Sequence, residues 1–97
     1  MTRSWTEARK KCEGEPCRVC GGIAHDPAHV IPRSRIPGPE AMHAANIVPL
    51  CRGDHKAFDQ GRLDLLPYLT REEQTHAASL VGLAEAYQRT TNTRSAA

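Results

Sequence analysis

Large aromatic side chains are scarce in this sequence, which holds one Trp, two Tyr and one Phe among 97 residues. We expect a chain of this length to fold as a single domain over residues 1–97 and to bury only about 60–65% of its unfolded surface. Because so few large apolar groups are present, the core should be marginal and should need a disulfide or metal staple.

Long hydrophobic runs are also missing. No stretch approaches the roughly 18–20 apolar residues of a membrane-spanning helix, so we expect no membrane partner. Residues 1–11 are charged and contain no apolar run, so we expect no secretory signal there. These absences predict a cytoplasmic protein, in which paired cysteines are metal ligands rather than disulfides.

A strong charge of one sign is absent as well, since the formal net charge at pH 7 is only +2. Residues 1–62 carry ten Lys or Arg against seven Asp or Glu, whereas residues 63–97 carry three against four. The positive excess therefore lies with the cysteines and most of the histidines. This distribution suits a polyanionic partner, although an ordinary solvated basic surface has the same composition.

Periodicity and turn residues predict an α+β fold with flanking N- and C-terminal helices. Thr70 and Glu73 form a capping-box pattern that begins a helix, and Gly61 is placed to end the preceding one. β-Branched residues directly before a proline indicate a very short strand beside His29. The expected elements are a helix over 4–11, strands near 29–31 and 47–50, a loop over 33–45, a helix over 52–60 and a packing helix over about 70–90.

Cysteine spacing predicts a structural zinc site. Cys17 and Cys20 form a C-x-x-C pair that places two thiolates on one tight turn, and tetrahedral zinc needs two further ligands. Cys51 opens the predicted helix over 52–60 and is the natural third ligand. Asp54 follows it by three residues, so one helical turn puts both side chains on the same side.

The fourth zinc ligand has two other candidates. Cys12 offers a sulfur only five residues before Cys17, and His25 offers a ring nitrogen. The C-x-x-C pair is also typical of thioredoxin-like redox sites, but those usually lie in a larger βαβ setting that this chain lacks. Asp54 is therefore our first choice.

Three polar residues stand in a characteristic apolar frame. His29 is followed by Val-Ile-Pro-Arg-Ser over 30–34, and Asn46 by an apolar run ending in Leu-Cys, with His55 nine residues after Asn46. This pattern resembles the HNH endonuclease family, whose members show a His before an apolar pair and Pro, then an Asn, an apolar run and a second His. The resemblance covers about residues 17–60.

The resemblance implies a small zinc-stabilised ββα-metal unit of treble-clef-like type, in which a hairpin packs on a helix with one divalent metal between them. By the same resemblance, His29 is the general base that activates water, Asn46 positions that base or its loop, and His55 binds the catalytic Mg²⁺, Mn²⁺, Ni²⁺ or Zn²⁺. The implied activity is metal-dependent hydrolysis of phosphodiester bonds in double-stranded DNA.

The residue types suit this chemistry on their own terms. Histidine titrates near pH 7 and can take a proton from water, and a divalent cation stabilises the charge that develops on a phosphodiester. Taken singly, His29 is as readily a hydrogen-bonded loop histidine, and His55 an exposed helix residue or a zinc ligand. Only the joint pattern indicates catalysis.

One position departs from the family pattern. Many members place Asp or His directly before the base as a second metal ligand, whereas this chain has Ala28. Asp59 is our first candidate to replace that ligand, because it lies four residues after His55 on the same helix face. Asp26, three residues before His29, is the second. Ala28 also supports an alternative function, a catalytically impaired zinc-dependent DNA-binding module.

We expect phosphate contacts to dominate DNA binding, because no base-reading element is recognisable. The basic residues expected to face the DNA are Arg33, Arg35, Arg52, Lys56 and Arg62. Small proteins that resemble this one are often phage-encoded beside packaging genes. The resemblance therefore also implies phage packaging proteins as partners, the host cytoplasm as location and an accessory role in packaging as an alternative function.

Overall fold

The computed structural model describes residues 5–36 and 38–91 of the chain. Its helices are α1 (Trp5–Cys12), α2 (Arg52–Asp59), α3 (Arg71–Val81) and α4 (Leu83–Thr90), and its strands are β1 (Asp26–His29) and β2 (Ile47–Leu50). Short 3-10 helices at Pro39–Met42, Ala44–Asn46 and Leu66–Tyr68 lie in the connections. The fold is α+β, as the sequence predicts, and no described helix has the length and apolarity to span a bilayer.

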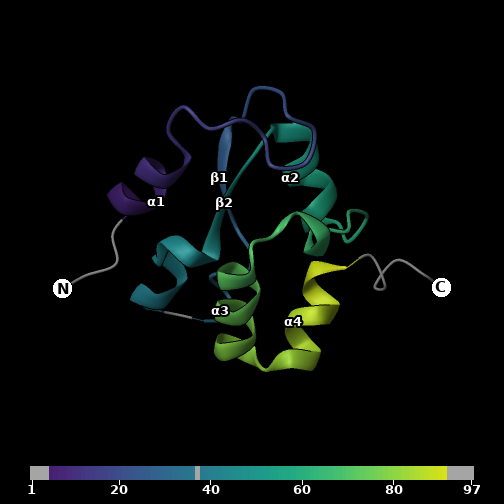
Figure 1. The fold of residues 1–97 in the computed structure, drawn as a ribbon. Helices are drawn as coiled ribbons and strands as arrows, with labels where there is room; N and C mark the ends of the chain where they lie inside the picture. The colour runs from purple at the N-terminus through teal and green to yellow at the C-terminus, as the bar shows by residue number, and fades with distance from the viewer. Residues whose placement is uncertain (1–4, 37, 92–97) are drawn as a thin grey trace.

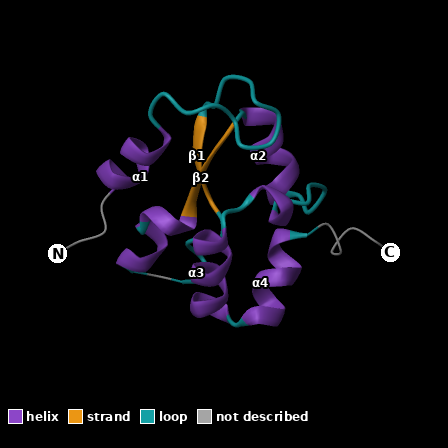
Figure 2. Cartoon of the chain, viewed as in Figure 1, coloured by secondary structure: helices purple, strands orange, loops and turns teal. Residues whose placement is uncertain are grey.

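The two strands pair antiparallel in the middle of the fold, with α1 on one side and α2 on the other (Figure 1 and Figure 2). The register pairs Asp26 with Leu50 and His29 with Ile47. α2 follows β2 directly, through the N-cap residue Cys51. This hairpin and helix form the predicted ββα unit, and the unit brings β1 next to α2.

β1 lies earlier than predicted, because the sequence places a strand near 29–31 and the observed strand ends at His29. The amide of Val30 still donates to the carbonyl of Asn46 at 2.8 Å. At Ile31, however, the amide donates to the side-chain Oδ1 of Asn46 at 2.9 Å. A buried amide side chain thus replaces the next backbone partner, and strand pairing stops there.

An apolar core fills the space between the hairpin, α2 and the C-terminal helices. Its largest fully buried apolar side chains are Phe58, Ile31, Ile47, Leu50, Leu65, Val30 and Val48. This set is aliphatic apart from Phe58, in line with the scarcity of aromatic residues. The core therefore depends on many small contacts rather than on a few large rings.

The predicted helix ends are confirmed at two places. The Thr70 hydroxyl accepts from the amide of Glu73 at 3.1 Å, and the Glu73 carboxylate accepts from the amide of Thr70 at 2.8 Å, which completes the capping box of α3. α2 ends just before Gly61, whose φ is 74°. α1 covers most of the helix predicted over 4–11, of which residue 4 lies outside the described residues.

The single packing helix predicted over about 70–90 is wrong. Gly82 has φ 90° and ψ 156°, a conformation open to glycine, and it divides the segment into α3 and α4 (Figure 1). The break also changes which face of the second half is buried. Ala84 and Tyr87, expected in the apolar face, are exposed, whereas Ala86 and Thr90 are buried.

A buried carboxylate joins α1 and the cysteine loop to α3. Glu73 accepts from Lys11 Nζ at 2.8 Å and from Arg18 at 2.7 and 3.1 Å, while its side chain is only 3% exposed. Burial by itself raises the pKa of Glu73, but these two cations and the Thr70 amide outweigh it and hold the pKa at about 2. Glu73 is therefore ionised at pH 7 and fixes three segments relative to one another.

Candidate active site and metal centre

The predicted zinc ligands come together in space. One ligand atom from each of Cys17, Cys20, Cys51 and Asp54 lies within 4.8 Å of the other three. The Asp54 carboxylate oxygen is 3.3 Å from the sulfurs of both Cys17 and Cys51, and the sulfurs of Cys20 and Cys51 are 3.9 Å apart. This Cys₃Asp group could hold a metal ion.

Backbone hydrogen bonds shape the turn that carries the first two cysteines. The amide of Cys17 donates to Gly22 at 2.8 Å, and the amide of Gly21 donates back to Cys17 at 2.9 Å. The amide of Arg18 donates to the carbonyl of Pro49 in β2 at 2.9 Å. These bonds dock the turn against the hairpin, opposite the start of α2.

The ligand atoms of this group affect one another's protonation. The amide of Asp54 lowers the pKa of Cys51, but burial, the Asp54 carboxylate and the two neighbouring thiols raise it to about 11. Burial also opposes ionisation of Cys17, whose pKa is nevertheless lowered by the surrounding backbone amides. A bound metal ion would favour ionisation of these cysteines, because its charge stabilises the thiolate form.

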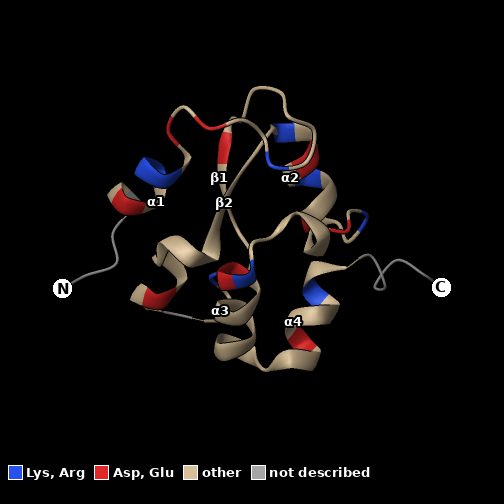
Figure 3. Ribbon diagram, in the orientation of Figure 1, with Lys and Arg blue, Asp and Glu red and all other residues tan. Residues whose placement is uncertain are grey.

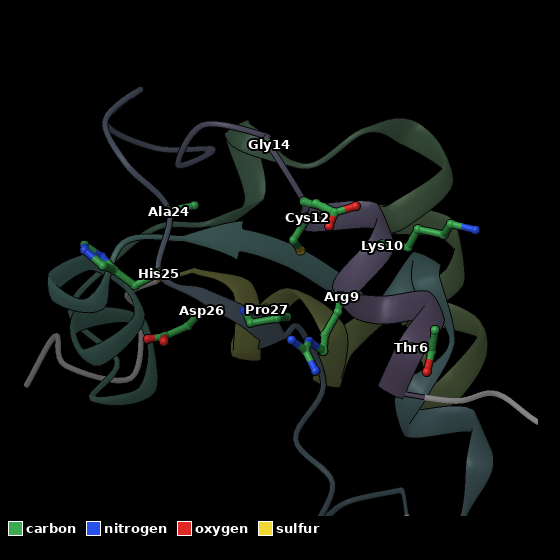
Figure 4. Close-up of a pocket in the computed structure, with 10 residues that line it drawn as sticks. Thr6, Arg9, Lys10, Cys12, Gly14, Ala24, His25, Asp26 and Pro27 are labelled. Atoms are coloured by element: carbon green, nitrogen blue, oxygen red, sulfur yellow. The ribbon is translucent and has the colours of Figure 1, made fainter.

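The two rival ligands lie elsewhere. Cys12 and His25 line a separate cavity of about 490 Å³ between α1 and the start of β1 (Figure 4). His25 Nδ1 there accepts from the amide of Arg52 at 3.2 Å. Neither side chain belongs to the Cys₃Asp group.

His29 and His55 line one hollow of about 260 Å³, together with Arg33, Asp59 and Arg89. His29 stands at the end of β1 and His55 on α2, so the hairpin and the helix both contribute to the lining. Pro32 and Ser34 complete the lining. We call this cavity the His29–His55 hollow.

The His29 ring is half-buried, and its surroundings favour the neutral form. Burial lowers the pKa of His29 below the ordinary 6.5, and the positive charge of Arg33 and the proximity of His55 lower it further. Its Nε2 lies 3.4 Å from the thioether sulfur of Met42, a weak acceptor. A neutral ring that carries its hydrogen on Nε2 can donate it to this sulfur.

Asn46 holds the backbone that follows His29 rather than the ring itself. Its fully buried side chain accepts from the amide of Ile31, and its Nδ2 donates to the carbonyls of Ile31 and Ala41, each at 3.0 Å. All three bonds are to main-chain atoms on either side of the loop. Asn46 therefore fixes the path of the chain on which the His29 ring stands.

Two carboxylates flank His55 on opposite nitrogens. His55 Nδ1 donates to Asp26 Oδ2 at 2.9 Å, and His55 Nε2 lies 3.4 Å from Asp59 Oδ2. The hydrogen bond from His55 lowers the pKa of Asp26, so that carboxylate is ionised. Because Nδ1 is the donor to Asp26, Nε2 is the ring nitrogen that lies on the same side as Asp59.

Two carboxylates are candidates to replace the metal ligand that Ala28 cannot provide. Asp59 lines the hollow, whereas Asp26 contacts the other nitrogen of His55 and does not line it. Ala28 itself is fully buried in the apolar core. Asp26 and Asp59 do not converge with His55 as a three-ligand group among the described residues. One carboxylate thus lies beside His55 Nε2 and the other beside Nδ1.

The predicted DNA-facing residues divide into two groups. All five are exposed and differ in their contacts, and Figure 3 shows basic bands along α2. Arg33 lines the His29–His55 hollow, and Arg52 lies 3.5 Å from Asp26. Arg35 instead forms two hydrogen bonds to Glu85 on α4, and Arg62 donates to Gln60. The Arg35 side chain does not line the hollow.

Sequence reasoning missed Arg89 and Met42. Arg89 comes from α4 and reaches the hollow across a long sequence separation, and Met42 comes from a connection predicted as loop. No local pattern marks either residue. Their only signal is a polar or soft side chain on a segment that the fold later brings beside His29.

The family comparison covers the hairpin, α2 and both clusters described above. Residues 17–64 match a protein-family model described as HNH endonuclease. The matched segment begins at Cys17 and extends just past α2, so it contains the whole Cys₃Asp group and every hollow-lining residue except Arg89. No curated protein and no solved structure matches the chain.

Proposed function

Residues 17–64 make this chain a member of the HNH endonuclease family, and on that premise we propose that it is a metal-dependent endonuclease that hydrolyses phosphodiester bonds in double-stranded DNA. The observation that carries the proposal is the His29–His55 hollow, where a half-buried imidazole and an oriented imidazole share one open cavity. A cavity lined by Arg33 and Arg89 also suits an anionic substrate.

His29 is the proposed general base. Burial keeps its pKa below 6.5, so the ring is neutral at pH 7 and can accept a proton from water. As the water oxygen bonds to phosphorus, the bond from phosphorus to the leaving oxygen breaks. The leaving oxygen takes a proton from solvent, and the products are a phosphate monoester and a free hydroxyl.

Asn46 is the proposed positioning residue for this base. Its three main-chain hydrogen bonds hold the segment after His29 in a single path. A base acts efficiently only when its nitrogen is held within hydrogen-bonding reach of the water. Asn46 therefore contributes through the backbone and does not touch the reacting atoms.

His55 and Asp59 are the proposed ligands of the catalytic ion, either Mg²⁺, Mn²⁺, Ni²⁺ or Zn²⁺. When bound, such an ion supplies positive charge to the phosphate and to the leaving oxygen. Asp26 holds the His55 ring by Nδ1 and leaves Nε2 to coordinate, which is the usual arrangement behind a metal-bound histidine.

The Cys₃Asp group is the proposed structural zinc site. Zn–S bonds of about 2.3 Å and Zn–O bonds of about 2.0–2.2 Å give a tetrahedron with edges of about 3.5–3.8 Å. The contacts of 3.3 and 3.9 Å are close to these edges, and all four ligand atoms lie within 4.8 Å of one another. A full set of four protein ligands is typical of a structural rather than a catalytic site.

Supercoiled plasmid and added Mg²⁺, Mn²⁺, Ni²⁺ or Zn²⁺ provide the test. We expect the wild-type protein to nick the plasmid only with metal, and His29→Ala to lose the activity while it keeps its fold and its zinc. Equal nicking by the wild-type protein and His29→Ala would show that the base assignment is wrong.

Ala28 favours a second candidate function, a zinc-dependent DNA-binding module without catalysis. The family ligand position is occupied by a methyl group that is fully buried in the core. A shift of labelled duplex in a gel without nicking at any metal concentration would support this second function over the first.

A further inference from the structure

Arg89 lies outside the residues matched to the family, yet it lines the cavity that contains His29 and His55. It stands near the end of α4, in the helical pair that follows the ββα unit. Figure 3 shows a basic band on this helix. The His29–His55 hollow is therefore completed by a part of the chain that the family pattern does not include.

Three contacts fix the Arg89 guanidinium in place. Its Nε donates to the carbonyl of Val30 at 3.0 Å, its Nη2 donates to Asp59 Oδ1 at 3.1 Å, and its Cζ lies 4.2 Å from the centroid of the Phe58 ring. The Arg89 side chain is only 13% exposed. Val30 follows His29 in the chain, and Asp59 Oδ2 lies 3.4 Å from His55 Nε2, so the guanidinium is held by a neighbour of each histidine.

A guanidinium that is fixed before the substrate arrives is well suited to a phosphate group. It is planar and always charged, and the guanidinium group is well matched to phosphate oxygens. Because its position is set by Val30 and Phe58, little reorganisation is needed when charge develops in the transition state. Asp59 on its other side offsets the charge while the cavity is empty of DNA.

We propose that Arg89 contacts the scissile phosphodiester in the His29–His55 hollow, so that α4 supplies a catalytic residue to the nuclease unit. The proposal rests on the proposed endonuclease function. The competing explanation is that Arg89 has a structural role alone and holds α4 against the ββα unit. Arg35 and Glu85 form another tie between α4 and the same region, with bonds of 2.5 and 2.8 Å, and they do not line the hollow.

Glu85→Gln is therefore the matched control for Arg89→Met, because it removes the charge from the Arg35–Glu85 ion pair and lies outside the hollow. Two readouts are needed: the plasmid-nicking rate with Mn²⁺, and the affinity for a labelled 20-base-pair duplex at several salt concentrations without added Mn²⁺ (a length of about two helical turns). Thermal unfolding reports whether each variant keeps its fold.

Arg89→Met should lower the nicking rate about 100-fold or more, as expected for loss of a preorganised charged donor. It should also reduce the slope of log affinity against log salt by about one, the signature of one lost phosphate contact. Glu85→Gln should reduce neither quantity. An unchanged salt slope in folded Arg89→Met would overturn the proposal, and so would an equal loss of nicking in Glu85→Gln.

The salt slope separates this inference from the function on which it rests. If the wild-type protein binds the duplex but never cleaves it, the endonuclease proposal fails while the slope still tests Arg89. If Arg89→Met unfolds, Arg89→Lys keeps the charge and most of the stem but loses the planar fork. Arg89→Lys should then cleave at least about tenfold more slowly than wild type, and full activity would contradict the proposed phosphate contact.

Discussion

The pKa of His29 connects its burial to the pH dependence of cleavage. Partial burial, the charge of Arg33 and the proximity of His55 hold that pKa below 6.5. A base with a lowered pKa stays neutral, and hence active, to lower pH. The cleavage rate should therefore rise with pH through a midpoint below 6.5 and then level off.

A series of single-turnover nicking rates between about pH 5 and 8 measures that midpoint. His29→Ala serves as the control, since its residual nicking rate should not show the rise with pH that the His29 imidazole causes. A midpoint at or above 6.5 in the wild-type protein would contradict the account of how burial acts on this ring.

Asp26 and Asp59 should affect metal binding differently, although both carboxylates lie beside His55. Asp59→Asn changes a proposed ligand directly, whereas Asp26→Asn weakens the hydrogen bond that holds the His55 ring by Nδ1. Loss of such an orienting partner typically lowers metal affinity 10–100-fold. We expect Asp26→Asn to fall in that range and Asp59→Asn to bind Mn²⁺ more weakly still.

Isothermal titration of the zinc-loaded protein with Mn²⁺ gives both affinities. Glu13→Gln is the matched control, because Glu13 lines the same cavity as Asp26 and makes no contact with His55. If Glu13→Gln bound Mn²⁺ as weakly as Asp26→Asn, the affinity would depend on the total negative charge near the site and not on the orientation of the His55 ring.

At the scale of elements, Glu73 on α3 joins α1 and the cysteine loop, and this contact should make stability depend on pH. Its folded pKa is about 2, against 4.5 when unperturbed. A lowered carboxylate pKa stabilises the folded state fully above pH 4.5, and the contribution is lost as pH falls from 4.5 toward about 2. Its size at pH 7 is about 3 kcal/mol.

Chemical denaturation of Glu73→Gln at pH 7 and at pH 3 tests this contribution. The variant should lose about 3 kcal/mol of unfolding free energy at pH 7, with the difference from wild type shrinking in acid. Glu72→Gln, an exposed neighbour on the same helix, should change the free energy by no more than about 0.5 kcal/mol. Equal effects of the two substitutions would exclude the buried network as the cause.

Local signals predicted most of the elements, while side chains distant in sequence determined the rest. The capping box at Thr70 and the stop at Gly61 depend on a few neighbouring residues and are confirmed. Gly82 is a glycine within a helical pattern, which such patterns often tolerate, so the break between α3 and α4 was not evident. β1 was shifted because Asn46 takes the amide of Ile31 from fifteen residues away.

The same distinction applies to the candidate site. The spacing of the cysteines and of Asp54 predicted a group that the fold brings within 4.8 Å. Spacing alone could not exclude Cys12 or separate the roles of Asp26 and Asp59, because those depend on which side of His55 each carboxylate lies. Arg89 joins the hollow through the packing of α4, for which the sequence carries no motif.

At the scale of the whole molecule, the proposed zinc ion should hold the fold together. Cys20 is exposed and Cys12 is half-buried, so packing alone predicts that Cys12→Ala costs more stability. A metal staple predicts the opposite order, because Cys20 belongs to the Cys₃Asp group and Cys12 does not. Removal of one ligand from a structural zinc site commonly unfolds a small domain.

Far-ultraviolet circular dichroism and zinc content by atomic absorption should be measured for both variants and for wild type treated with a chelator. Cys20→Ala and the chelated protein should lose zinc and most of their structure, whereas Cys12→Ala should keep both. A folded, zinc-free Cys20→Ala protein would be incompatible with the staple.

A crystal structure of His29→Ala with a short DNA duplex and Mn²⁺ tests the central claim most directly, because the variant should bind substrate without cutting it. We expect anomalous scattering from one Mn²⁺ beside His55 Nε2 and Asp59. A phosphate of the DNA backbone should lie between that ion and the place that the His29 imidazole occupies in the wild-type protein. A phosphate bound elsewhere, or an ion that does not contact His55, would contradict a shared active site for the two histidines.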